Sequence, residues 1–155
     1  GGSLMAMGRI RPNRIVAAFG LIAALGLVAP VAFSAEMGMM AANQLKTALE
    51  HAKLAQEANT LASVKVHLQH VVNCIEGPKG AMFNAGGGNP CQGQGNGILA
   101  DMKEAGGQYT DAIPWVETAG EIALVGLHAD TLGRAKAAAW ATQATLEHLG
   151  MMMHK

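Results

Sequence analysis

The sequence predicts an all-α protein, an antiparallel four-helix bundle that consists of two duplicated helical hairpins with a Gly-rich connecting loop. Three observations predict this fold class. Small and apolar residues recur at alternating spacings of three and four in two regions, both regions contain the same short motif, and a glycine-dense segment separates them. Such spacing is the a/d pattern of packed helices, and two hairpins of this length bury their apolar stripes by packing together.

The first predicted hairpin covers residues 40–76, with one helix at about 40–58 and a second at about 60–76. Its apolar positions are Leu45, Ala48, Ala52 and Ala55, followed by Leu61, Val64, Leu68, Val71 and Ile75. Asn59 or Thr60 can cap the second helix, because a side-chain oxygen at this position accepts a hydrogen bond from a free backbone N–H.

The second predicted hairpin covers residues 114–150 and repeats the first. The segment ANTLASVK at 58–65 matches ADTLGRAK at 129–136, and the same offset carries most of the apolar pattern onto small or apolar residues. We expect helices at about 114–129 and 131–149, with Gly150 ending the last one. Alanine and glycine at many core positions imply that the helices approach closely or leave room between them.

Residues 77–113 form the predicted connecting loop. Glycine and proline dominate residues 77–97, which have little periodicity, and a short helical turn is expected at 98–105. No Gly-Lys-Ser/Thr follows the glycines and no strand is predicted before them, so neither a P-loop nor a dinucleotide-binding fingerprint is expected.

Residues 1–35 consist of a short remnant or upstream extension, residues 1–4, followed by a segment that resembles a secretory signal. Arg9, Arg11 and Arg14 provide the basic region, residues 15–29 are apolar, and small residues allow cleavage after Ser34 or Ala35. Pro30 is expected to break any helix. A periplasmic or secreted bundle of residues 36–155 follows from this interpretation, without a stable membrane span after cleavage, because the apolar run is shorter than the roughly 20 residues of a spanning helix.

Export affects how the two cysteines are interpreted. Cys74 and Cys91 are expected to form a disulfide in an oxidising compartment, and the alternative is a free Cys74 that acts as a thiolate ligand. The formal net charge of the whole chain is zero, and with the three N-terminal arginines set aside the remainder is mildly acidic. This charge argues against nucleic acid as a partner.

The segment HLQHVVNC, residues 67–74, indicates a metal site. His67, His70 and Cys74 stand at i, i+3 and i+7, and His51 lies level with His67 if the helices of the first hairpin are antiparallel. In one bundle arrangement the two imidazoles face each other, and in the other both turn toward the second hairpin. Imidazole binds zinc, copper, nickel and iron. The second hairpin lacks histidines at the equivalent positions, so this cluster is not a by-product of the repeat.

The methionines indicate copper, with haem b as an alternative cofactor. Three of them, Met37, Met39 and Met40, lie before the first predicted helix, and three more follow Gly150, at the same end of an up-down bundle. Thioethers favour copper in its reduced state. A haem b carrier would instead use a methionine such as Met37 or Met40 with His148, and the absence of a CxxCH motif argues against covalent haem.

In outline, the signal, the small helical body and the scattered His and Met residues resemble small periplasmic four-helix-bundle metal-binding proteins. The resemblance implies an exported protein that binds or buffers copper or a similar transition metal, although the chain has fewer histidines and cysteines than high-capacity storage requires. No catalytic motif is present, so an enzyme is not expected. A structural or partner-binding helical module remains an alternative, and a protein partner or a homo-oligomer stays open.

Overall fold

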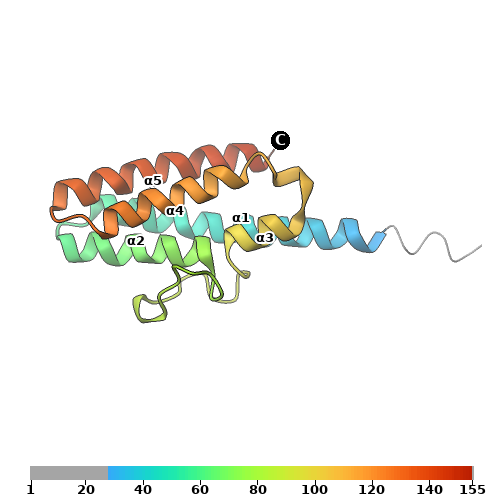
Figure 1. Cartoon of the computed structure of the whole chain (residues 1–155), viewed down its shortest axis with the longest axis horizontal. Coiled ribbons are helices and arrows are strands. Elements are labelled where there is room, and N and C mark those ends of the chain that lie inside the picture. The colour runs from blue at the N-terminus through green and yellow to red at the C-terminus, as the bar shows by residue number, and fades with distance from the viewer. Residues whose placement is uncertain (1–27, 155) are drawn as a thin grey trace, which may run out of the picture.

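The computed structural model describes residues 28–154, and every regular element in this part of the chain is helical (Figure 1). The α-helices are α1 (Val28–Glu57), α2 (Leu61–Glu76), α3 (Ile98–Ala105), α4 (Ile113–Leu127) and α5 (Leu132–Met153). Two short 3-10 helices, η1 (Ala85–Gly87) and η2 (Gly107–Tyr109), lie in the connection between α2 and α4. The all-helical class predicted from the sequence is confirmed.

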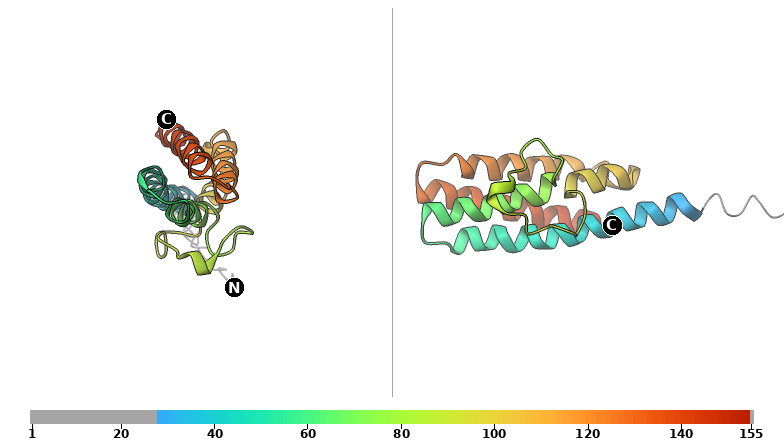
Figure 2. Two further views of the ribbon diagram at one scale, coloured as in Figure 1. Left: turned by 90° about the vertical axis from the view of Figure 1, so that its left-hand side faces the viewer. Right: turned by 90° about the horizontal axis from the view of Figure 1, so that it is seen from below.

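The four long helices lie side by side, and the chain reverses direction in the short turns after α1 and after α4 (Figures 1 and 2). α1 packs against α2 and α5, and α4 packs against α5 and α2. The Gly-rich loop lies beside α2, on the side away from α4 and α5, in all views. The outer side of the α4/α5 pair is therefore free of this loop.

The core contains the residues that the sequence pattern predicted, with alanines packed among larger leucine, valine and isoleucine side chains. Leu45, Ala48, Ala52 and Ala55 are buried on α1, and their predicted counterparts on the other three long helices are buried too, except Leu61 and Leu132 at helix starts. Helix approach is closest at Gly126 of α4, where an added Cβ would overlap the Leu68 side chain of α2 and lie 2.9 Å from the Cβ of Ala138. Small side chains thus allow close helix contact.

Both hairpin turns use a threonine cap. The hydroxyl of Thr60 accepts a hydrogen bond from the N–H of Ser63 at 3.1 Å, and the hydroxyl of Thr131 accepts one from the N–H of Arg134 at 3.3 Å. Each satisfies a backbone donor that the first turn of a helix leaves free. The expected capping of the second helix by residue 59 or 60 is confirmed, with Thr60 as the cap.

Two predicted helix ends were wrong. α1 begins at Val28 rather than near residue 40, and it runs through Pro30. Proline in the first turn costs little because the N–H it lacks has no partner inside the helix there. At the other end, α5 continues past Gly150 to Met153. An added Cβ at Gly150 would make an ordinary 3.7 Å contact with Leu45 of α1, so this position, inside α5, accepts a glycine without needing one.

The predicted helical turn at 98–105 is confirmed as α3, which packs against the first half of α1. The hydroxyl of Ser34 donates to the carbonyl of Ala105, and Gly38 lies directly against the hydroxyl of Tyr109. Further along, the buried side chain of Gln44 donates to Asp101 at 2.6 Å. α3 is therefore held to α1 by two hydrogen bonds, and η2 contacts α1 between them.

Most of the predicted signal segment, including the three arginines and nearly all of the apolar run, lies in residues 1–27, outside the described part of the chain. Within residues 28–154, no helix combines the length and the apolar character needed to cross a membrane.

Candidate metal centre

Three histidine side chains meet at the contact between α1 and α2. His51 comes from α1, and His67 and His70 come from successive turns of α2. The turn at residues 58–60 folds α2 back along α1, which places His51 level with His67 as the sequence predicted. Of the two arrangements that the sequence left open, the structure shows the one in which the imidazoles face each other.

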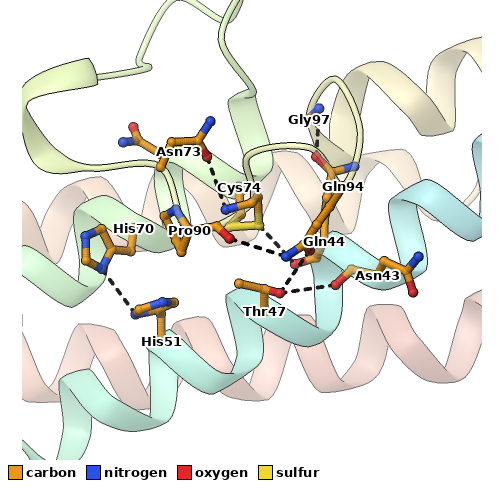
Figure 3. The surroundings of a disulfide bond; sticks show 12 residues. Asn43, Gln44, Thr47, His51, His70, Asn73, Cys74, Pro90, Gln94 and Gly97 are labelled. Carbon is orange, nitrogen blue, oxygen red and sulfur yellow. Dashed lines mark hydrogen bonds between the residues drawn. A yellow bond between two sulfur atoms is a disulfide. The ribbon is translucent and has the colours of Figure 1, made fainter.

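The cluster is joined through Nδ1 atoms. The Nδ1 of His51 lies 3.2 Å from the Nδ1 of His67 and 3.2 Å from the Nδ1 of His70 (the second contact is drawn in Figure 3). Ring centroids are 4.5 to 5.9 Å apart, and one nitrogen of each ring lies within 4.8 Å of the other two. His70 is thus a full member of the cluster.

These separations are close to those in a metal complex. With metal–nitrogen bonds of about 2.0 to 2.1 Å and tetrahedral angles, bound nitrogens lie about 3.3 Å apart. Both distances from His51 are within about 0.2 Å of that value. Both pairs that contain His51 therefore have metal-ligand spacing, and ring rotation that brings the His67 and His70 nitrogens closer together would allow all three histidines to bind one ion, with one coordination position left open.

The surroundings of His51 and His67 favour the neutral form of these two rings. Burial, together with the neighbouring His70 and His67, lowers the pKa of His51 from 6.5 to about 4. Burial, followed by the effect of His70, also lowers the pKa of His67. Neutral imidazole is the form that binds metals, so protons compete weakly for these ligands at neutral pH.

Cys74 does not belong to the site, and its inclusion among the metal ligands was wrong. Its sulfur is bonded to that of Cys91 at 2.00 Å, and both residues are buried. The expected disulfide is therefore formed, and it leaves no thiolate at this position. A donor set of three nitrogens without sulfur remains.

The Gly-rich loop is attached next to the histidines. The side chain of Asn73, fully buried on α2, donates to the carbonyls of Asn84 and Gly88 at 2.8 and 2.5 Å and accepts from the N–H of Asn84 at 2.9 Å. This holds Gly88 against His70, where an added Cβ would lie 3.1 Å from Nε2. The φ of Gly88 is 86°, which favours glycine.

Sequence reasoning missed Asn73 and Gly88. The available signal for Asn73 was a polar residue inside the apolar run of α2, next to the cysteine. Buried polar side chains need partners, so this residue could have been expected to hold a neighbouring segment. Gly88 is one of three consecutive glycines, and nothing in the sequence distinguishes it from the other two.

The residues proposed for haem are placed separately from the triad. His148 of α5 stacks on the ring of Trp115 of α4, with centroids 4.0 Å apart. Met37 is buried on α1, and Met40 is partly buried one turn later. None of the described contacts joins His148 to either methionine. The haem alternative stays a prediction.

Among residues 28–154, the histidine triad is the one group of three or more His, Cys, Asp or Glu side chains with metal-ligand spacing. Comparisons with protein-family models, with curated proteins and with solved structures find no match to this chain. The triad itself therefore carries the argument for function.

Proposed function

We propose that this protein binds a divalent transition-metal ion, copper or zinc, through His51, His67 and His70, and that it acts as a metal-binding or metal-buffering protein. The observation that carries the proposal is the position of the His51 Nδ1, 3.2 Å from the same atom of each partner. Three imidazole ligands suit Cu²⁺ and Zn²⁺. Copper, which the methionines indicated, is retained here in its divalent form because the triad offers no sulfur.

The methionine clusters are treated as separate from this site. Met40 precedes His51 by eleven residues on α1, which corresponds to about 16 Å along a helix. Thioethers at that distance cannot bind the same ion. The proposal therefore does not depend on them.

The proposal includes export. The disulfide between Cys74 and Cys91 is compatible with an oxidising compartment. Since residues 1–35 have the sequence pattern of a secretory signal, we infer a periplasmic or secreted protein. Mass spectrometry of the protein after expression with its N-terminus would test the inferred cleavage after Ser34 or Ala35, and an intact N-terminus would contradict it.

We also propose that the two hairpins arose by duplication. The equivalent caps, Thr60 and Thr131, support this origin together with the matching segments at 58–65 and 129–136. The three histidines of the site have no equivalents in the second hairpin, where Ile122, Ala138 and Ala141 occupy the corresponding positions. In this scheme the site belongs to the first hairpin alone.

Chelator competition with Cu²⁺ and Zn²⁺ tests the metal site. The variant His67→Ala should bind at least about 100-fold more weakly than the unmodified chain, because it loses one of three ligands. His154→Ala, which changes an exposed histidine at the end of α5, should bind as the unmodified chain does. In the unmodified chain, ion at 100 times its Kd should stabilise the fold by about 2.7 kcal/mol.

Two outcomes would contradict the proposal. Equal losses of affinity in His67→Ala and His154→Ala would indicate loose surface binding rather than a defined site. A melting temperature that does not respond to either metal would favour the structural or partner-binding alternative.

A further inference from the structure

The outer sides of the two hairpins differ in polarity. On α1, exposed residues at helical spacing form a charged stripe of Lys46, Glu50, Lys53 and Glu57. On α5, the exposed positions between Arg134 and Glu147 are Ala137, Trp140, Ala141 and Ala144. A helix that is apolar on its exposed side is usually covered by another surface.

The apolar area continues from α5 onto α4. A groove of about 600 Å³ runs between the two helices, and Ile122, Val125 and Ala137 form its apolar walls. Val125 is 67% exposed, and Trp140, one turn beyond Ala137, is 65% exposed. We refer to this surface as the α4/α5 face, which consists of Ile122, Val125, Ala137, Trp140, Ala141 and Ala144.

No described segment covers the α4/α5 face, since the Gly-rich loop lies on the opposite side of the bundle (Figures 1 and 2). The face extends about 20 Å along the helices and about 20 Å across them. Its area of about 400 Å² is within the range of patches that serve as interaction sites. It is smaller than the roughly 800 Å² per partner of a standard stable complex, which is consistent with reversible association.

The charged residues at the two ends of the α4/α5 face indicate a second copy of this chain as the partner. The charged residues of α5 are Arg134 and Lys136 near its start and Glu147 near its end. Within residues 28–154, Arg134 is paired with the exposed Asp130 at 3.3 Å, whereas Lys136 forms no ion pair. A second α5 in antiparallel orientation presents its acidic end to this basic end.

We propose that the α4/α5 face docks on the same face of a second copy of this chain. With a two-fold axis between Trp140 and Ala141, Ala137 lies opposite Ala144 of the second copy, and the small side chains allow close helix approach. Glu147 then lies within reach of Lys136 of the second copy, because both side chains lie on the flank of α5 that contains Gln143, and like flanks meet in a two-fold contact. The contact is self-complementary, as a two-fold interface requires.

Sedimentation velocity on the full chain, over a wide concentration series, tests the dimer. The unmodified chain should convert from monomer to dimer as concentration rises, and Trp140→Glu should weaken association by about tenfold or more. The matched control is Val66→Glu on α2, which charges a residue of similar exposure outside the face and should leave association unchanged. Circular dichroism melting checks that both variants fold.

Charge exchange tests the antiparallel register. Glu147→Lys and the double variant Arg134→Glu/Lys136→Glu should each dimerise more weakly by themselves, because like charges then meet. An equimolar mixture of the two should form a heterodimer. Three results would overturn the proposal: a chain that stays monomeric at every concentration, an association that persists in Trp140→Glu, or a mixture that fails to restore dimerisation. The first would mean that another molecule covers this face.

Discussion

At the scale of single residues, the position of His51 determines the properties of the site. Its ring contacts both other histidines through one nitrogen. Burial of its ring, together with the neighbouring His70 and His67, disfavours the charged form of His51 and lowers its pKa. The same features that disfavour a proton leave a lone pair available to a metal ion.

Stability of the metal-free protein should therefore depend on pH. Because the pKa of His51 falls from 6.5 to about 4 on folding, the unfolded chain binds more protons between these values. The stabilisation is fully present above pH 6.5 and is lost progressively as the pH decreases toward 4. After allowance for partial exposure of the ring, the loss attributable to His51 should be about 1–2 kcal/mol.

Urea unfolding in the presence of a chelator, at several pH values from 7.5 to 5, measures this dependence. His51→Gln should show a smaller decrease in the free energy of unfolding over the same range. Identical pH profiles for the two proteins would show that this histidine does not couple protonation to folding. The lowered pKa of His67 acts in the same direction, so some dependence should remain in the variant.

Alanine substitutions at two separate glycines test how closely the helices are packed. Gly126→Ala should destabilise the protein by about 1–3 kcal/mol, because the new methyl group would overlap Leu68 and crowd Ala138. Gly133→Ala is the control: this glycine is also helical, but it is exposed and an added Cβ meets no atom within 4 Å. The control should be neutral or stabilising by up to about 1 kcal/mol. Thermal unfolding that affects both variants alike would argue against close contact at Gly126.

At the scale of helices and loops, the sequence pattern predicted the interior of each element better than its ends. Alternating spacings of three and four located the four long helices because these positions face a shared core. Pro30 and Gly150 misled the prediction of ends, since a proline is tolerated in the first turn of a helix and a glycine can lie inside a helix at a modest cost. Local signals of this kind cannot reveal packing partners distant in sequence.

In the candidate site, too, the sequence predicted how the helices align but not the contacts that depend on the loop. The predicted register of α1 and α2 was sufficient to bring His51 and His67 together. The side-chain rotation that directs His70 toward His51, and the hydrogen bonds of Asn73 that hold Gly88 behind it, depend on the folded loop. Helical spacing contains no information about such a loop.

Removal of the disulfide should affect the loop more than the helices. Cys74 and Cys91 are 17 residues apart, and a loop of that length contributes about 3 kcal/mol in the chain-entropy model. The double variant Cys74→Ala/Cys91→Ala should lose about this much unfolding free energy, measured by urea denaturation, with its helical circular dichroism retained. Unchanged stability would mean that the hydrogen bonds of Asn73 are sufficient to order the loop.

Metal binding in the same double variant provides a separate measurement. Because the three imidazoles are held by α1 and α2, removal of both sulfurs should leave the ion bound. A complete loss of binding would indicate that the cysteines or the loop they hold are required for the site.

At the scale of the whole molecule, the two hairpins have different surfaces on a similar helical framework. The first presents charged residues to solvent and contains the histidines, and the second presents an apolar face. In the assembly proposed above, the second hairpins lie at the centre of a dimer. The two histidine clusters then lie on the hairpins away from the contact, so metal binding and association should be separable by mutation.

The three contacts of α1 with α3 and η2 have a consequence for maturation by proteolysis. Cleavage after Ser34 or Ala35 would detach Ser34 from the carbonyl of Ala105. Gly38 would still support the Tyr109 ring, and Gln44 would still be bonded to Asp101. A signal peptidase could thus trim the first two turns of the longest helix without releasing the segment that connects the halves of the molecule.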